Sequence, residues 1–383
     1  MIVVIADDFT GASELGGIGV RYGLNVEIQT DVHLDTDTDL LIIDTNSRSL
    51  SSRNAKHETR KVVSRLQKKE VDWLFKKTDS VMRGHILEEL EVLIPGLGKK
   101  NALLVPASPS FGRTISDGKY FIKNKLLHET AFSRDPEYPA LTSDVLELLG
   151  HSKTLESRVS SAANAIYEKG IIIGEVQNTS DLKKWALVAD ETIPAGSAEF
   201  FAAILESRGY REKKTLVCND FLPRKKTLLV CGSSLPLCKS MTEKIQHRGF
   251  IISQLPCSIF NFKALSTSCL QEWTRQTMLA FQKSDRVMVS INQPVLRNPS
   301  VAHRLAHFMT ALVEAVFDQV SIHELLIEGG STASSIVRQL GFDRLIPQIE
   351  LTQGVVRMRP LSRSNQFFTV KPGSYEWPDK MWN

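Results

Sequence analysis

The chain has 383 residues, of which 42% are hydrophobic and 23% charged, and its formal net charge is +4. A chain of this length is too long for one ordinary hydrophobic core, so two domains are predicted. The small net charge, with both signs dispersed along the chain, argues against a nucleic-acid-binding protein. No run of about 18 apolar residues is present, so no membrane span is expected. The five cysteines form no Cys-x-x-Cys pair and their number is odd, which favours free thiols and a cytoplasmic protein over a disulfide framework.

In the first half, short apolar runs alternate with helical patterns. The predicted strands are Ile2–Ala6, Val26–Gln29, Leu40–Asp44, 73–76, 102–106 and Gly170–Gly174, and the predicted helices are 11–22, 54–69, 86–93 and 197–207. Residues 115–140 have no clear period and predict an irregular excursion over the surface. Strand and helix in alternation predict a parallel sheet with helices on both faces.

A domain boundary is predicted near "CNDFLPRKK", residues 218–226, which combines Pro223 with a basic run. A second set of elements follows, with predicted strands at 227–232, near Ile251, at 286–291, 324–328, 355–360 and 367–373, and predicted helices at 237–247, 268–283, 301–318 and after 330. The sequence therefore predicts an α/β protein with two α/β domains, 1–222 and 226–383, with largely parallel sheets and a cleft between them.

The first strand runs directly into Asp7 and Asp8. Neighbouring side chains on an extended backbone point in opposite directions, so one carboxylate is expected to face the crevice where parallel sheets bind ligands. The other is expected to cap the helix that starts near Thr10. From this stretch alone, an equally good interpretation makes both residues caps or turn residues.

Two other strand ends in the first half carry cations. The stretch "FKKTDSVMRGH" brings Lys77, Asp79 and Arg83 close together, and "VPASPSFGRT" contributes Arg113. Cations mixed with a carboxylate and hydroxyls suit an anionic, hydroxylated ligand, because arginine binds a carboxylate with two hydrogen bonds. The alternatives are a solvated loop with a weak Lys–Asp pair and a turn that happens to contain an arginine.

Three turns in the second half combine glycine with hydroxyl residues or lysine, in "CGSSLPLCKS", "IEGGSTASS" and "TVKPGSYEWP". Free N–H groups at a helix start bind phosphate, and glycine lets the backbone approach it closely. Ordinary tight turns are the alternative, because neither a Walker A motif nor Gly-x-Gly-x-x-Gly is present. His303 and His307 lack the glutamate of a His-Glu-x-x-His metal site and predict a surface or core role.

Taken together and in this order, these stretches resemble the four-carbon acid sugar kinase family. The similarity is carried by "IADDFTGASE", "DTNSRS", "KKTDSVMRGH" and "VPASPSFGRTISDG" in the first half and by "VCGSSLP", "EGGSTAS" and "VKPGSYEWP" in the second. The resemblance implies a kinase that phosphorylates threonate, erythronate or 3-oxo-tetronate with ATP, at the terminal 4-hydroxyl. It also implies an acid-sugar domain followed by a nucleotide domain, with the reaction in the cleft.

The resemblance further implies the site residues. The implied catalytic residues are Asp8, Asp79 and Arg83, the implied substrate-binding residues are Ser47, Arg48, Lys77 and Arg113, and the implied nucleotide-binding residues are Ser233, Ser234, Gly329, Gly330, Ser331, Thr332 and Gly373. In this interpretation Arg83 or Arg113 binds the substrate carboxylate, and Asp8 or Asp79 orients the attacking hydroxyl and accepts its proton. No protein metal ligand is expected, because Mg²⁺ is held mostly by phosphate oxygens and water.

Two departures from the family pattern concern the sites. Glu14 stands where the family often has Asp, and Ser331 replaces an acidic residue that is common after the glycine pair. One rival interpretation is therefore a non-catalytic small-anion-binding or regulatory protein on the same scaffold, and another is an α/β transferase for a different small anion. The expected partners are a four-carbon acid sugar and ATP, without nucleic acid or membrane, and the sequence leaves a homodimer open.

Overall fold

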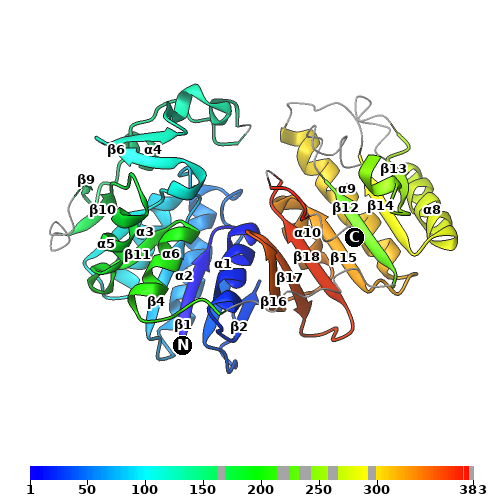
Figure 1. Cartoon of the computed structure of the whole chain (residues 1–383), viewed down its shortest axis with the longest axis horizontal. Coiled ribbons are helices and arrows are strands. Elements are labelled where there is room, and N and C mark those ends of the chain that lie inside the picture. Colours follow the sequence, from blue (N-terminus) through cyan, green and yellow to red (C-terminus); the bar gives the residue numbers. More distant parts are fainter. Residues whose placement is uncertain are drawn as a thin grey trace. The chain divides into compact units, whose positions relative to one another are not determined.

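The computed structural model describes residues 1–135, 137–161, 169–213, 225–232, 243–257, 266–291, 299–373 and 375–378, without the side chains of 299–303 (Figure 1). The chain separates into two compact units, Met1–Lys213 and Lys214–Asn383. Most of the predicted boundary at 218–226 lies outside the described residues, so the domains 1–222 and 226–383 stay a prediction. Both units contain helices and mostly parallel strands, which confirms the predicted α/β class with largely parallel sheets, whereas the predicted cleft stays a prediction.

The first unit is built on a parallel sheet. Its strands, in spatial order, are β2 (Val26–Gln29), β3 (Leu40–Asp44), β1 (Ile2–Ala6), β4 (Trp73–Lys77), β11 (Ile193–Gly196), β5 (Asn101–Val105), β10 (Gly170–Gly174) and β9 (Ser157–Ser160). Most of these strands are continuous apolar runs, because a parallel sheet in the middle of a domain is buried on both faces. Ile2–Ala6 is buried at every position.

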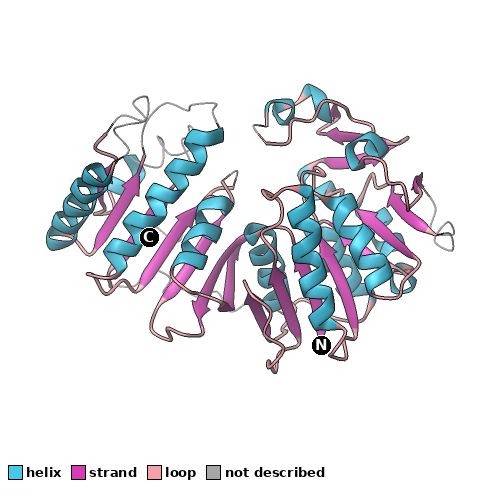
Figure 2. Ribbon diagram, turned by 180° about the vertical axis from the view of Figure 1, so that it is seen from behind, coloured by secondary structure: helices cyan, strands magenta, loops and turns pink. Residues whose placement is uncertain are grey.

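Helices cover both faces of this sheet. Helix α6 (Ala198–Ser207) packs against α1 (Phe9–Arg21) and α5 (Thr179–Ala186), and α2 (Ser52–Leu66) packs against α3 (Ile86–Gly96). The first group lies toward the viewer in Figure 1 and the second in Figure 2. Another short helix, α4 (Val145–Leu149), follows the 115–140 region. Because each parallel crossover is right-handed, the helices alternate between faces according to the direction in which the chain moves across the sheet.

The expectation of an irregular excursion at 115–140 was wrong. An antiparallel three-stranded sheet forms there from β6 (Arg113–Ser116), β7 (Lys119–Ile122) and β8 (Lys125–Leu126). Two-residue turns join the strands, at Asp117–Gly118 and at Lys123–Asn124, and all four turn residues have positive φ. Turns of this kind match the twist of hairpin strands, so the Asp-Gly dipeptide was a usable hairpin signal.

The second unit contains a mixed sheet. Strands β13 (Ile251–Gln254), β14 (Arg286–Ser290), β12 (Thr227–Cys231), β15 (Glu324–Glu328) and β18 (Phe367–Lys371) are parallel, whereas β17 (Val355–Pro360) pairs antiparallel with β18 and with β16 (Arg344–Thr352). Helix α9 (Pro299–Phe317) packs against α8 (Thr267–Lys283) and α10 (Gly330–Gln339). The predicted helix at 237–247 lies mostly outside the described residues.

Two cysteines of the second unit differ from the expectation of free thiols. Cys257, after β13, and Cys269, in the first turn of α8, form a disulfide with their Cα atoms 6.3 Å apart. This Cα–Cα distance lies within the range that a disulfide spans. The spacing of the cysteines in the sequence did not reveal the pair. Separately, no helix in the described residues is long and apolar enough to cross a membrane.

Candidate functional site

The predicted site residues of the first unit follow adjacent parallel strands. Strand β1 lies between β3 and β4, with Ala6 opposite Asp44 on one side and opposite Lys77 on the other. The segments that leave these strands, beginning at Asp7, Thr45 and Thr78, therefore emerge at one edge of the sheet. This is the carboxyl edge, where α/β sheets bind their ligands.

Arg48 holds both aspartates of the opening motif. Its Nε and Nη2 donate to the Asp7 carboxylate at 2.8 and 3.0 Å, and Nη2 also donates to Asp8 Oδ1 at 2.8 Å. Burial of Asp7 opposes ionisation, but the charges of Arg48, Lys76 and Lys77 outweigh it and hold the pKa of Asp7 below its ordinary value. One arginine thus donates hydrogen bonds to two neighbouring carboxylates.

The two aspartates have different local roles. Asp8 is the N-cap of α1 and accepts a hydrogen bond from the backbone N–H of Gly11 at 3.0 Å, whereas Asp7 is only 1% exposed. The expected helix cap is therefore Asp8. Because its side chain keeps 16% of its exposure, Asp8 can still contact a ligand, and its catalytic role stays a prediction.

Arg83 is already bound by two carboxylates. Its Nε and Nη2 donate to Asp79 at 3.0 and 2.9 Å, and its Nη1 donates to Asp135 at 2.9 Å. Asp79 also accepts the backbone N–H groups of Val81 and Arg83. Burial of Asp79 opposes ionisation, but Arg83 and Arg48 together hold the pKa of Asp79 far below its ordinary value. The Asp79–Arg83 pair therefore stabilises the loop after β4.

Arg113 has a different environment. Its Nη1 donates to Ser80 Oγ, and its guanidinium carbon lies 5.7 Å from the ring centroid of Phe111 and 5.8 Å from that of Phe132. Within the part of the chain that the structure describes, Arg113 pairs with no carboxylate. A guanidinium has five N–H donors, so most of those of Arg113 remain available to a ligand.

Lys77 and Glu14 lie beside the first turn of α1. Lys77 Nζ donates to the carbonyl of Thr78 at 2.9 Å and is 3.8 Å from Glu14 Oε2. A Cβ added at Gly11 would lie 2.7 Å from Asp8 Oδ1 and 3.3 Å from Lys77 Nζ, so only glycine fits between these groups. Glu14 departs from the family pattern and was not among the predicted site residues, although it lies one helical turn after Gly11.

Ser47 lies beneath this edge of the sheet. It is fully buried and donates to Glu89, which also pairs with Lys76 Nζ at 3.0 Å. Burial raises the pKa of Glu89, although Lys76 opposes this effect. The structure therefore places Ser47 among buried groups that support the strand ends, and its predicted contact with substrate stays untested.

In the second unit, the glycine pair after β15 starts helix α10. Gly329 has φ +104°, a conformation that favours glycine. Because Gly329 has no side chain, it cannot cap the helix. Among the described residues, no acceptor binds the backbone N–H groups of Gly330, Ser331 and Thr332. Such a helix start attracts an anion. A Cβ at Gly232 would collide with Thr332 Oγ1, so the end of β12 lies against this turn.

Lys371 organises the loop after β18. Its buried Nζ donates to the carbonyls of Pro372 and Tyr375 at 3.0 and 2.6 Å and lies 3.6 Å from Glu328 Oε1. Burial lowers the pKa of Lys371 and raises that of Glu328. The loop that contains Gly373 is thus tied to the end of β15. Ser233 and Ser234 lie outside the described residues.

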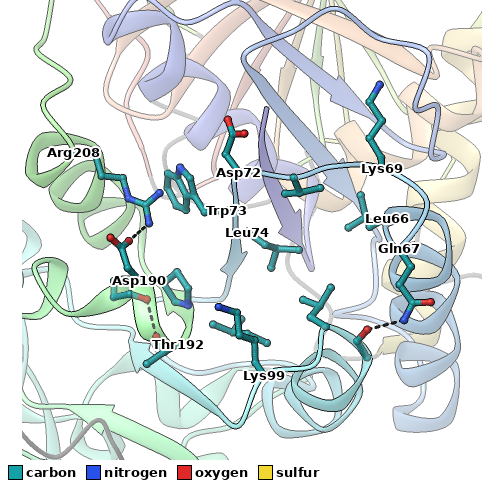
Figure 3. A pocket seen from close by; sticks show the side chains of 16 residues that line it. Leu66, Gln67, Lys69, Asp72, Trp73, Leu74, Lys99, Asp190, Thr192 and Arg208 are labelled. Atoms are coloured by element: carbon teal, nitrogen blue, oxygen red, sulfur yellow. Dashed lines mark hydrogen bonds and ion pairs between the residues drawn. The ribbon is translucent and has the colours of Figure 1, made fainter.

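A cavity of about 580 Å³ lies elsewhere in the first unit, at the amino ends of β4 and β11 (Figure 3). Arg208 pairs with Asp190 at its rim and lies over the ring of Trp73, 4.0 Å from its centroid. None of the predicted site residues lines this cavity.

In the described residues, no group of three or more His, Cys, Asp or Glu side chains could hold a metal ion.

Comparison with known proteins gives a consistent result. Residues 2–219 match the family model described as a sugar-binding N-terminal domain. A 3-oxo-tetronate kinase of Actinobacillus succinogenes is 22% identical over 406 residues, which cover 98% of this chain and 96% of that protein. A D-threonate kinase of Salmonella typhimurium is 30% identical over 151 residues, which cover 39% of this chain and only 36% of that protein.

The fold has also been solved before. The structure of a Haemophilus influenzae protein superposes with a TM-score of 0.73 at 20% sequence identity, and the match covers 99% of this chain and 98% of that one. At this identity the match shows the fold alone.

Proposed function

This chain belongs to the four-carbon acid sugar kinase family, and we propose that it transfers the γ-phosphoryl group of ATP to the terminal hydroxyl of a four-carbon sugar acid. It is a sugar-acid kinase and therefore a phosphotransferase. The proposed acceptors are threonate, erythronate and 3-oxo-tetronate. The observation that carries the proposal is the difference between Arg83, which is bound by carboxylates, and Arg113, which is not.

Arg113 is the proposed anchor for the substrate carboxylate. Its guanidinium is placed by stacking near Phe111 and Phe132 and by one hydrogen bond to Ser80, so little side-chain freedom is lost when a ligand binds. A carboxylate can accept two parallel N–H bonds from it. Arg83 already donates to Asp79 and Asp135 and serves to hold the loop.

The hydroxyl end of the substrate is proposed to lie over Gly11, beside Asp8 and Lys77. Asp8 orients a hydroxyl through its exposed edge, Lys77 attracts the phosphoryl group, and a hydrogen bond from the Arg48 guanidinium holds Asp8 in place. Asp79 acts through Arg83 and Arg48 rather than on the substrate. Phosphoryl transfer needs mainly positioning and charge neutralisation, and these groups provide both.

The second unit is proposed to hold the nucleotide. The helix start after Gly329 offers the unbound N–H groups of Gly330, Ser331 and Thr332 to the phosphates. Gly373 lies in the loop after β18, and Ser233 and Ser234 stay predicted nucleotide-binding residues. Mg²⁺ fits this arrangement as an ion held by phosphate oxygens and water, where it would neutralise charge on the phosphates. The proposal requires the acid-sugar domain 1–222 and the nucleotide domain 226–383 to present these residues to one cleft during turnover.

A coupled assay of ADP release tests the proposed function. We expect ADP to form with at least one of D- and L-threonate, D- and L-erythronate and 3-oxo-tetronate, and far more slowly with the four-carbon polyols erythritol and threitol, which lack a carboxylate. Binding of these acids without any ADP release would instead favour a non-catalytic anion-binding protein. Release with unrelated sugars or amino acids would indicate a different transferase.

Replacement of Asp8 tests its proposed contact with the substrate. We expect Asp8→Ser and Asp8→Ala both to lower kcat about 100-fold, because both remove the carboxylate that orients the hydroxyl. Serine can still cap α1, whereas alanine removes the cap and costs about 1 kcal/mol of unfolding free energy. Steady-state kinetics and urea denaturation of both variants separate the two effects. Near-normal turnover of Asp8→Ser would show that Asp8 is a structural cap only.

A further inference from the structure

Most carboxylates at the carboxyl edge of the first unit are bound to cations. Asp7 and Asp8 receive hydrogen bonds from Arg48, and Asp79 and Asp135 receive them from Arg83. A carboxylate that an arginine holds in its ionised form is a poor proton acceptor, because taking a proton breaks its charge-assisted bonds. These residues are therefore suited to fix geometry rather than to move a proton.

Glu14 differs from them in its contacts. It lies on the face of α1 that carries Gly11, with 16% of its side chain exposed, and its nearest cation is Lys77 Nζ at 3.8 Å, beyond hydrogen-bond distance. In the described part of the chain, no donor forms a hydrogen bond with its carboxylate. Its oxygens are consequently open to a donor from a ligand.

The surroundings of Glu14 favour proton uptake. The charged groups that face it are Lys77 of β4, Asp8 at the N-cap of α1, Arg113 of β6 and Glu199 of α6. Burial raises the pKa of Glu14 above its ordinary value; Lys77 and Arg113 oppose the rise, while Asp8 and Glu199 add to it. A carboxylate with a raised pKa is a stronger base than an ordinary one.

We propose that Glu14 is the general base of the kinase, accepting the proton of the substrate hydroxyl. This inference rests on the proposed function. The hydroxyl proton moves to a Glu14 oxygen while the hydroxyl oxygen forms a bond to the γ-phosphorus of ATP. The bond from the γ-phosphorus to the β,γ-bridging oxygen breaks, ADP leaves with that electron pair, and the proton passes from Glu14 to water after product release.

The position of Glu14 also orders the substrate. Glu14 and Arg113 interact electrostatically but form no ion pair with each other, and the proposal places a short acid between them. Its carboxylate would contact Arg113 while a hydroxyl at its other end would contact Glu14. The replacement of the family's aspartate by glutamate lengthens this side chain by one methylene, and the position of the base relative to Gly11 changes accordingly.

The test compares Glu14→Gln, Glu14→Asp and Glu199→Gln with the wild-type chain, using the best acid of the ADP-release panel. We expect Glu14→Gln to lower kcat about 100- to 1,000-fold with little change in the KM of the acid, and Glu14→Asp to recover part of the loss. The wild-type kcat should fall at acidic pH with an apparent pKa above the ordinary value of Glu, and Glu14→Gln should abolish this limb.

Glu199→Gln is the matched control, because Glu199 faces the same space but is hydrogen-bonded to Ser110. It should keep most of the activity and the acidic limb, and circular dichroism with thermal melting should show that the Glu14 variants are folded. A folded Glu14→Gln chain that keeps its turnover or its acidic limb overturns the inference and leaves the kinase assignment standing. A wild-type chain that phosphorylates none of the acids overturns both.

Discussion

Arg113→Gln is expected to lower kcat/KM for the sugar acid by about 1,000-fold, which corresponds to about 4 kcal/mol. The reason is that Arg113 is the described arginine of this site whose guanidinium meets no carboxylate, so a bound acid would provide its missing partner. Glutamine is of similar length but cannot form the charged, two-bond contact. Steady-state kinetics with the acid as the varied substrate measure the change.

Two controls decide what Arg113 binds. Arg134→Gln changes an exposed arginine of the neighbouring 3-10 turn and should leave kcat/KM unchanged. The corresponding polyol, which lacks the carboxylate, should be used equally poorly by the wild-type chain and by Arg113→Gln. If Arg113→Gln instead loses activity toward the acid and the polyol in the same proportion, Arg113 does not bind the carboxylate.

Asp79→Ala is expected to lower the unfolding free energy of the chain by about 3–5 kcal/mol. The change leaves Nε and Nη2 of Arg83 without their carboxylate acceptor, removes a carboxylate that lies 3.6 Å from Arg48 Nη1, and removes an acceptor of the backbone N–H groups of Val81 and Arg83. Glu58→Ala, which breaks an exposed pair with Lys61 on α2, should cost less than about 0.5 kcal/mol. Urea denaturation followed by tryptophan fluorescence compares the two, and equal effects would contradict the assignment.

Asp79 also makes the unfolding free energy of the chain depend on pH. Since Asp79 has a lower pKa in the folded chain than in the unfolded chain, its contribution is complete above the ordinary aspartate pKa of about 4 and declines as the pH falls below it. The wild-type chain should therefore lose unfolding free energy between about pH 5 and pH 2 more steeply than Asp79→Asn. Parallel slopes for the two proteins would show that Asp79 is not held ionised by Arg83 and Arg48.

The sequence predicted most of the strands because their signal is local. Val26–Gln29, Leu40–Asp44 and Gly170–Gly174 were correct at both ends, since the first alternates apolar and polar residues and the other two are short apolar runs. The starts of α1 and α2 were placed two residues late, because the caps Asp8 and Ser51 set them. The hairpins after Arg113 were missed, since their short strands carry little periodicity.

The candidate site divides in the same way. That Asp8, Lys77, Asp79, Arg83 and Arg113 lie at strand ends follows from the sequence, because polar residues that end apolar runs must emerge at the carboxyl edge of a parallel sheet. Which charges pair with one another does not follow from it. Arg48 is 40 residues or more from its partners Asp7 and Asp8 along the chain, and strand order and register bring them together.

The sequence by itself thus determined the α/β class, the edge at which the polar residues gather and the family to which the chain belongs. The tertiary structure alone decided that Asp8 is the cap, that Arg83 is already neutralised and that Glu14 and Arg113 keep open groups. The physical reason is that strand formation and helix capping depend on neighbouring residues, whereas burial and ion pairing depend on contacts between segments far apart in the chain.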